Sequence, residues 1–195
     1  MRVHYVVLSI ALIVAIAVAT TQPAVGAFGG NGSGKSHQIP MKDLAGTFAE
    51  AAQGSIVFCF DSGGAQVACG TAGSSAVPFT YLSLGPVIRD SNGNACGSFT
   101  QTLADVPPSA NPPVVSQFQV GSKSTSYDPS TGTGDCSFSS YTGATCAGAI
   151  ATGGTVIGGG TCHFAATEGG DRFDFILTTL LGVGTFSISG FDHRD

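Results

Sequence analysis

The chain has 195 residues, of which only 10% are charged, and its 7 lysines and arginines against 12 aspartates and glutamates give a formal net charge of -5. Because it has no basic cluster to neutralise phosphates, we expect no nucleic-acid partner. Its 29 glycines, together with many serines and threonines, favour strands joined by glycine turns over helices with an exposed surface.

The amino terminus has the layout of a secretory signal peptide. Arg2 precedes an apolar stretch from Tyr5 to Ala19, and small residues lie around Ala27. The apolar stretch of about 15 residues is shorter than the roughly 20 that a membrane-spanning helix needs. We therefore expect residues 1–27 to be removed, with Ala19 as the alternative cleavage site. The mature chain is then a single secreted or periplasmic domain that no membrane holds.

Residues 28–41 form a Gly/Ser-rich segment that we expect to be a flexible leader. Within it, residues 29–36 (GGNGSGKS) match the phosphate-binding loop G-x-x-x-x-G-K-[ST] letter for letter. Such a loop needs a strand before it and a helix that begins at its Lys-Ser pair. Here the signal peptide precedes it and Pro40 interrupts any helix that starts at Lys35. We therefore expect no nucleotide to bind and no cofactor to be used.

Residues 42–192 are expected to form the domain, and their first segment is ambiguous. Residues 43–53 fit either a short helix capped by Asp43 or a first strand that continues into the next apolar run. After it, apolar or alternating runs recur between turn signals, at residues 55–60, 66–69, 78–82, 86–89, 95–103, 114–120, 136–139, 146–150, 161–167, 172–180 and 183–190. This spacing predicts an all-β fold, a single antiparallel up-and-down β-barrel, with a β-sandwich as the alternative.

All the cysteines lie after the predicted signal peptide, and we expect them to form three disulfides because their number is even. They are Cys59, Cys69, Cys96, Cys136, Cys146 and Cys162. Sequence alone leaves the pairing open. Short glycine-containing loops favour the pairs Cys59–Cys69 and Cys136–Cys146. The alternative, a metal site, lacks a C-x-x-C or H-x-x-x-H spacing, so we expect no metal.

Asp90, Asn92 and Asn94 place oxygen atoms at alternate positions, as the start of a calcium-binding loop does. An EF-hand loop also needs Gly at its sixth place and Glu at its twelfth, where this chain has Ala95 and Gln101. The Asn92-Gly93 dipeptide between two strand-like runs is typical of a hairpin turn. We therefore predict a turn here and no calcium site.

A two-residue turn at Gly169-Gly170 fixes the register of the strands on either side. One face then carries Cys162, Phe164 and Ala166 opposite Leu177, Phe175 and Phe173. The other, mixed face carries His163, Ala165 and Thr167 opposite Ile176, Asp174 and Arg172. One apolar face and one polar face indicate an antiparallel sheet around a single core.

His163 and Asp174 are the best candidates for a catalytic base and its carboxylate, because they lie diagonally across this hairpin. Both point outward, and we interpret them as a surface contact between strands. The sequence contains no G-x-S-x-G motif, and with all cysteines paired no thiol is left as a nucleophile.

Four short motifs resemble, in this order, those of uncharacterised exported bacterial proteins. They are residues 44–48 (LAGTF), residues 90–94 (DSNGN), Tyr127 with residues 131–134 (TGTG), and residues 173–177 (FDFIL). Such proteins are similar to barrels of the lipocalin or allene oxide cyclase kind. The resemblance spans most of residues 43–190, and it implies an up-and-down barrel without an assigned activity. The cysteines and the segment from Pro107 to Pro113 are not part of the pattern.

The sequence leaves three functions open. The first is an exported, non-enzymatic module that binds an apolar small molecule inside the barrel or a partner at its rim. A filled interior would exclude it, and 13 phenylalanines are enough to fill one. The second is a cofactor-free barrel enzyme, a cyclase or isomerase, which requires ionisable residues facing inward. The third is a structural envelope protein. The sequence predicts neither a ligand nor an oligomeric state.

Overall fold

The computed structural model describes residues 38–106 and 112–195. The predicted signal peptide (1–27), the GGNGSGKS segment and residues 28–37 of the predicted leader lie outside the described residues, so those expectations stay predictions. The end of the predicted leader is described, and Ile39 is hydrogen-bonded there to Pro129 and Tyr127. Within the described part, no helix is both long and apolar enough to cross a membrane.

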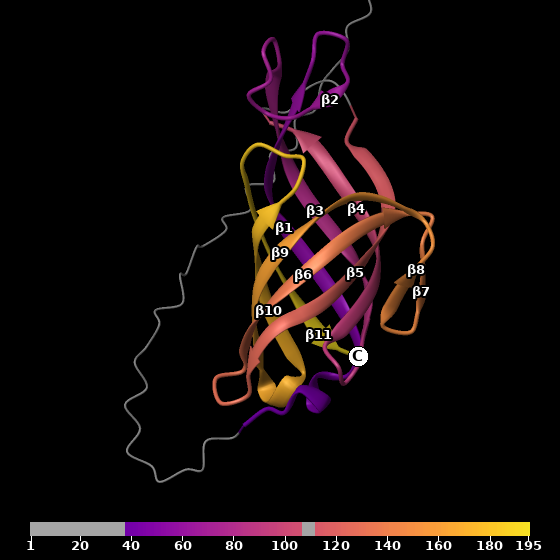
Figure 1. The fold of residues 1–195 in the computed structure, drawn as a ribbon, viewed down its shortest axis with the longest axis vertical. Coiled ribbons are helices and arrows are strands. Elements are labelled where there is room, and N and C mark those ends of the chain that lie inside the picture. The colour runs from indigo at the N-terminus through magenta and orange to yellow at the C-terminus, as the bar shows by residue number, and fades with distance from the viewer. Residues whose placement is uncertain (1–37, 107–111) are drawn as a thin grey trace, which may run out of the picture. The chain divides into compact units, whose positions relative to one another are not determined.

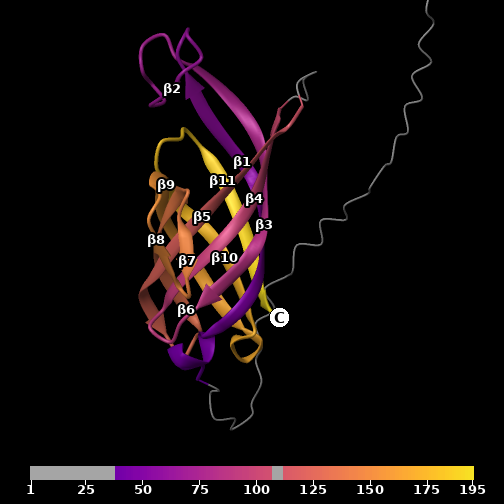
Figure 2. The ribbon, with the colours of Figure 1, turned by 90° about the vertical axis from the view of Figure 1, so that its right-hand side faces the viewer.

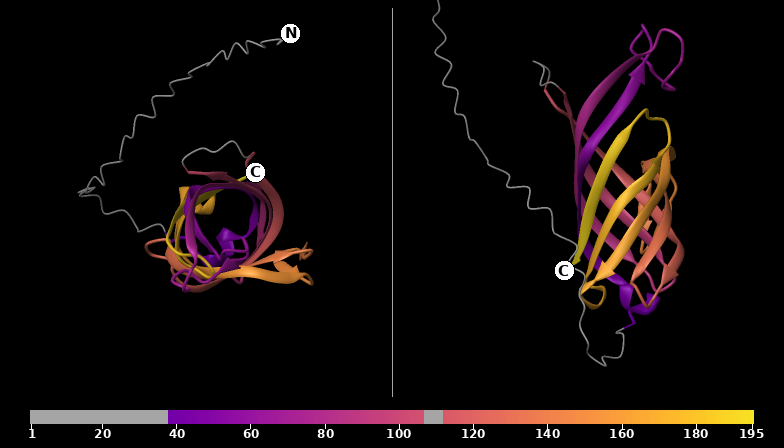
Figure 3. Two further views of the ribbon diagram at one scale, coloured as in Figure 1. Left: turned by 90° about the horizontal axis from the view of Figure 1, so that it is seen from above. Right: turned by 90° about the vertical axis from the view of Figure 1, so that its left-hand side faces the viewer.

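Eight long strands form one closed antiparallel barrel (Figure 1). In chain order they are β1 (Gly46–Phe60), β3 (Ser75–Arg89), β4 (Asn94–Asp105), β5 (Val114–Asp128), β6 (Thr133–Thr142), β9 (Thr155–Thr167), β10 (Arg172–Leu180) and β11 (Phe186–Arg194). Each pairs with the next of these along the chain, and β11 pairs with β1 to close the ring, seen from above in Figure 3. The predicted up-and-down barrel is thus confirmed, and the sandwich alternative is excluded.

Shorter elements lie at the ends and on the outside of the barrel. Strand β2 (Gln66–Val67) pairs with the end of β1, where β1 and β3 extend beyond the other strands (Figure 2). Strands β7 (Thr145–Ala147) and β8 (Ile150–Thr152) form a hairpin on the outside. The 3-10 turns η1 (Met41–Leu44) and η2 (Glu168–Gly170) lie at the end opposite β2.

The ambiguous segment 43–53 is mostly strand. A single 3-10 turn ends at Leu44, and β1 begins two residues later at Gly46. Phe48, Ala52 and Ile56 are buried because they lie on the inner face of β1 at even spacing. The helix alternative is therefore wrong beyond η1. Two other predicted strands, 78–82 and 86–89, are parts of β3, whereas 146–150 turns back at Gly148 between β7 and β8.

An aromatic cluster fills the end of the barrel that η1 covers, which we call the closed end. Leu44, Phe48, Phe164 and Phe173 are buried there together. The rings of Phe48 and Phe173 meet edge to face at a centroid distance of 5.2 Å. Seen from above, η1 lies within the ring of strands (Figure 3). Burial of these large side chains packs η1 and the first residues of β1 against the other strands of the barrel.

The register predicted for the hairpin of β9 and β10 is confirmed at every position. Phe173 pairs with Ala166, Phe175 with Phe164 and Leu177 with Cys162. The turn is made by η2, in which Gly169 and Gly170 both have a positive φ, at 72° and 100°. Glycine adopts such angles without a steric penalty, which is why this dipeptide fixes the register.

The turn predicted at Asn92-Gly93 is also confirmed, between β3 and β4. Asp90 Oδ1 accepts hydrogen bonds from the backbone N–H groups of Asn92 and Asn94, each at 2.9 Å. The Asn94 side chain donates to Asp90 Oδ2 at 2.8 Å. The oxygens that resembled the start of a calcium loop therefore organise the turn itself.

All six cysteines are paired, as the even count predicted, but only one of the two favoured pairs is correct. Cys59–Cys69 joins β1 to the loop after β2. Cys136–Cys162 links register partners on β6 and β9, and Cys96–Cys146 fastens the outer hairpin to β4. The predicted pair Cys136–Cys146 is wrong because the chain forms the hairpin of β7 and β8 before β9 returns to β6, so Cys162 and not Cys146 becomes the register partner of Cys136. Each bridge stabilises the fold by about 2–4 kcal/mol.

Candidate functional site: the cavity of the barrel

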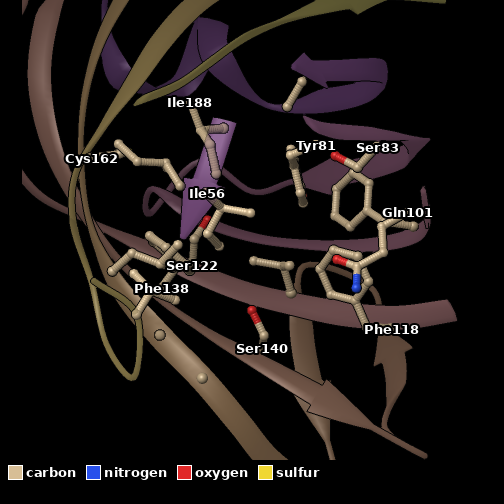
Figure 4. Close-up of a pocket in the computed structure, with 18 of the residues that line it drawn as sticks. Ile56, Tyr81, Ser83, Gln101, Phe118, Ser122, Phe138, Ser140, Cys162 and Ile188 are labelled. Atoms are coloured by element: carbon tan, nitrogen blue, oxygen red, sulfur yellow. The ribbon is translucent and has the colours of Figure 1, made fainter. Parts of the chain in front are cut away.

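The barrel encloses a cavity of about 520 Å³ between the aromatic cluster and the end that carries β2. Side chains from all eight long strands line it, and most are apolar, among them Ile56, Phe118, Phe138 and Ile188 (Figure 4). Small-molecule sites in proteins have volumes of about 300–1,000 Å³ and are lined in the same way. The cavity therefore has the size and the chemistry of a site for one small apolar ligand.

Small residues on β5, β6 and β9 keep the interior open despite the many phenylalanines. Ser122 and Ser140 line the cavity (Figure 4), and Ser140 is the register partner of Gly158. A Cβ atom added at Gly158 would meet no other atom within 4 Å. The filled interior that the sequence left open is thus excluded.

Three ionisable side chains, Glu50, Arg89 and Asp192, lie next to the aromatic cluster, and we call them the cavity floor. Glu50 on β1 and Asp192 on β11 are register partners, so their side chains leave the sheet side by side. Asp192 has 0% of its surface exposed, whereas Glu50 and Arg89 line the cavity. Two acids and one base therefore share one site beside the aromatic cluster, and Asp192 is the most deeply buried of them.

Arg89 is held on several sides. Its Nε donates to Asp192 Oδ2 at 3.1 Å, and its Nη2 donates to the same oxygen. The guanidinium also lies over the ring of Phe173, 4.3 Å from the centroid, and within 5.7 Å of that of Phe48. Since arginine stays charged in proteins, the Arg89 guanidinium places a positive charge against the buried carboxyl group of Asp192.

Glu50 lies beside the Arg89–Asp192 pair, as the register partner of Asp192. Burial raises the pKa of Glu50 well above its ordinary value, and the charge of Asp192 and a hydrogen bond with it raise that pKa further, while Arg89 lowers it. Asp192 Oδ1 is buried and takes no hydrogen bond from any amide, hydroxyl or guanidinium of the described residues. When Glu50 carries a proton, its carboxyl can donate to this oxygen, because two carboxyls can hydrogen-bond only if one of them is protonated.

Further polar groups line the cavity from β3 and β4. Tyr81 and Ser83 face it two residues apart, and Gln101 approaches from β4 (Figure 4). Burial raises the pKa of the Tyr81 phenol, a hydrogen bond with Ser83 lowers it, and the charge of Glu50 raises it. Gln101 donates to the Ser116 hydroxyl at 2.9 Å. The cavity thus offers uncharged hydroxyl and amide groups beside a large apolar surface.

His163 and Asp174 lie outside the cavity, as their register predicted, but they do not form a pair. His163 is 62% exposed and its Nδ1 contacts Asp135 on the neighbouring strand β6. Asp174 pairs with Arg172 on its own strand, at 2.7 Å. Their interpretation as surface contacts is supported, but the partner expected for His163 is wrong because strand β6 was not placed beside β9.

Sequence reasoning missed the cavity floor, although its signal was present at both ends of the domain. In the last strand Ile188 faces inward, and Asp192 lies four residues further along on the same face. In the same way, the strand alternative for residues 43–53 places Glu50 on the same face as Phe48 and Ala52. A carboxylate on an apolar face at each end of a closed meander points to a buried pair, since the first and last strands are neighbours.

The described residues contain no group of three or more histidine, cysteine, aspartate or glutamate side chains arranged to hold a metal ion. Comparisons with protein-family models, with curated proteins and with solved structures find no match to this chain. The geometry of the cavity is therefore the basis for the function.

Proposed function

We propose that this protein is an exported binding module that holds one apolar small molecule in its barrel. The observation that carries the proposal is the cavity of about 520 Å³, whose wall is apolar over most of its surface and polar at the closed end. A ligand that fills it exchanges water for contact with phenylalanine and aliphatic side chains, which is the main source of affinity in such sites.

Export is supported by two independent observations. The amino-terminal sequence has the layout of a signal peptide, and the described domain carries three disulfides, which persist in oxidising compartments. A ligand taken up outside the cytoplasm or in the periplasm would be carried in the dry interior, away from water.

Blocking the cavity tests the proposal. Gly158→Phe places a ring where a Cβ meets no neighbour, so it should occupy the ligand space without straining the wall. We expect the neutral fluorescent probe N-phenylnaphthylamine to bind the native protein at a single saturable site, with an affinity reduced by about tenfold or more in this variant, a loss of about 1.4 kcal/mol. Fluorescence titration measures both affinities.

A matched control places the same ring on the outside. Ser137 is exposed on β6, the strand that pairs with Gly158, so Ser137→Phe should bind the probe as the native protein does. Thermal unfolding checks that both variants remain folded. Equal binding by native protein and Gly158→Phe would contradict the proposal, because the probe would then bind elsewhere.

A cofactor-free barrel enzyme is the second candidate, because Glu50 and Tyr81 meet its requirement for ionisable groups inside the barrel. The two candidates differ in what happens to the ligand. Recovery of the bound molecule unchanged after long incubation supports a binding module, whereas a product that Glu50→Gln no longer forms supports an enzyme. A structural envelope protein requires no cavity at all.

A further inference from the structure

The charges at the closed end of the cavity limit which polar group of a ligand can bind there. Of the described residues that line the cavity, Arg89 is the only basic one, and two contacts with Asp192 Oδ2 already occupy it. The other polar groups that line this side of the cavity include the Glu50 carboxyl and the hydroxyls of Tyr81, Ser83, Ser122 and Ser124. The polar end of the cavity therefore has no spare positive charge.

An anion that entered this end would lose its hydration shell and gain no counter-charge. It would also approach the Asp192 carboxylate, which is fully buried and whose negative charge water does not screen. An uncharged hydroxyl pays a much smaller penalty for leaving water, and that penalty is recovered when the hydroxyl forms hydrogen bonds.

The Glu50 carboxyl offers the acceptor for such a hydroxyl. When it is protonated, this carboxyl can donate to Asp192 Oδ1, its neighbour across the strand pair, which takes no hydrogen bond from an amide, hydroxyl or guanidinium group of the described residues. Its second oxygen stays free to accept a hydrogen bond, on a side chain that lines the cavity. The Tyr81 hydroxyl, two residues from Ser83 on the adjoining strand β3, can donate to the same ligand.

We propose that the ligand is an uncharged long-chain or cyclic alcohol, whose hydroxyl binds at the cavity floor beside Glu50 and Tyr81, and that the corresponding carboxylates are rejected. This inference rests on the proposed binding function. It deepens that function because the paired state of the cavity floor, and not the size of the cavity, selects the class of ligand.

A matched set of ligands tests it. Dodecanol, its methyl ether and dodecanoic acid share one apolar chain, and each can displace N-phenylnaphthylamine from the native protein at a pH where the fatty acid is ionised. We expect dodecanol to bind at least about tenfold more tightly than dodecanoate. The ether, which cannot donate to Glu50, should fall between them.

Substitutions at the cavity floor test whether its charge or its shape causes the preference for the alcohol. Glu50→Gln keeps both a donor for Asp192 and an oxygen that faces the cavity, so the preference for the alcohol should remain. Asp192→Asn removes the anionic partner of Arg89, so dodecanoate should gain at least about tenfold relative to dodecanol. If the latter variant does not fold, the ligand series on the native protein still decides the question.

Each outcome has one meaning. Dodecanoate that binds the native protein as tightly as dodecanol does overturns the inference and leaves the proposed binding function standing. Failure of N-phenylnaphthylamine and of all three compounds to bind overturns both. A preference for the alcohol that persists unchanged in Asp192→Asn also overturns the inference, because the charge of the cavity floor would then not be its cause.

Discussion

The barrel holds two acidic contacts of similar composition in opposite surroundings. Inside, Asp192 meets Arg89 and Glu50 among aromatic rings, with 0% of Asp192 exposed. Outside, Asp135 meets His163 and the Ser126 hydroxyl at the surface, where His163 is 62% exposed. Each contact joins a carboxylate to a basic side chain on another strand, yet the effects on protonation run in opposite directions.

Solvent accounts for the difference. Burial raises the pKa of Glu50, since water cannot stabilise its charge and the charge of Asp192 opposes ionisation. Hydrogen bonds from Ser126 and then from His163 lower the pKa of Asp135, since they stabilise a carboxylate that stays in water. Burial therefore raises the pKa of a carboxyl on the inner side of the sheet, whereas hydrogen bonds lower that of a carboxyl on the outer side.

The largest expected effect comes from removing the buried partner. Asp192→Ala leaves Arg89 without its carboxylate in a mostly dry site, and we expect the free energy of unfolding to fall by about 3–5 kcal/mol. The same change in a Glu50→Gln background removes the other carboxyl of the cavity floor and should destabilise the protein at least as much. Urea unfolding measures both.

The outer control is Asp135→Ala, for which we expect a much smaller loss, because water replaces the hydrogen bonds that the carboxylate accepted. Equal losses for the inner and outer substitutions would contradict the distinction between the two contacts.

The second prediction concerns the pH dependence of stability. The folded state keeps the Glu50 proton after the unfolded chain has lost it, so Glu50 contributes stability at low pH that is lost as the pH rises above the ordinary glutamate value of about 4.3. Glu50→Gln removes this loss. We therefore expect the variant to gain stability relative to the native protein as the pH rises, in urea unfolding between about pH 3 and 8.

Asp135 should show the opposite sign. Its pKa is lowered on folding, so its contribution is present above the ordinary aspartate value of about 3.9 and is lost as the pH falls through the folded value. Asp135→Asn should therefore differ from the native protein least in acid. If the stabilities of Glu50→Gln and Asp135→Asn, each taken relative to the native protein, change in the same direction with pH, the predicted difference between the inner and outer carboxyls is wrong.

The smallest effect is expected on the outer face. His163→Gln removes an exposed contact, so the free energy of unfolding should change by only about 0.5 kcal/mol. Binding of N-phenylnaphthylamine should not change, because His163 does not line the barrel cavity. A large loss of probe binding would instead indicate that His163 has a functional role. Fluorescence titration of His163→Gln and of the native protein measures the two probe affinities.

The local sequence pattern predicted much of the fold. The glycine pair at 169–170 and the alternation on either side predicted the six partners nearest the turn between β9 and β10, because side chains on a strand switch faces at each residue and a short turn fixes the register. Beyond Leu177 the register shifts at an irregularity that the pattern did not predict. The Asn92-Gly93 turn followed from the same local chemistry. The outward position of His163 and Asp174 was predicted as well.

Local sequence patterns did not predict the contacts between residues far apart in the chain. The partner of Cys136 is Cys162 and not Cys146, since the chain makes an extra hairpin on the outside before β9 returns to β6. Asp135 reaches His163 for the same reason. Neither pairing has a local signature, because both depend on which strands become neighbours.

The sequence by itself determined the alternation of faces, the turns and the even set of cysteines, since these depend on backbone geometry within a few residues. Only the tertiary structure decided between the barrel and the sandwich, and so whether the first and last strands meet. That closure places Glu50 beside Asp192, two carboxyls 142 positions apart in the chain, as register partners near Arg89. It also leaves serines and a glycine facing a cavity, because whether inward side chains fill a barrel depends on their combined volume around the whole ring.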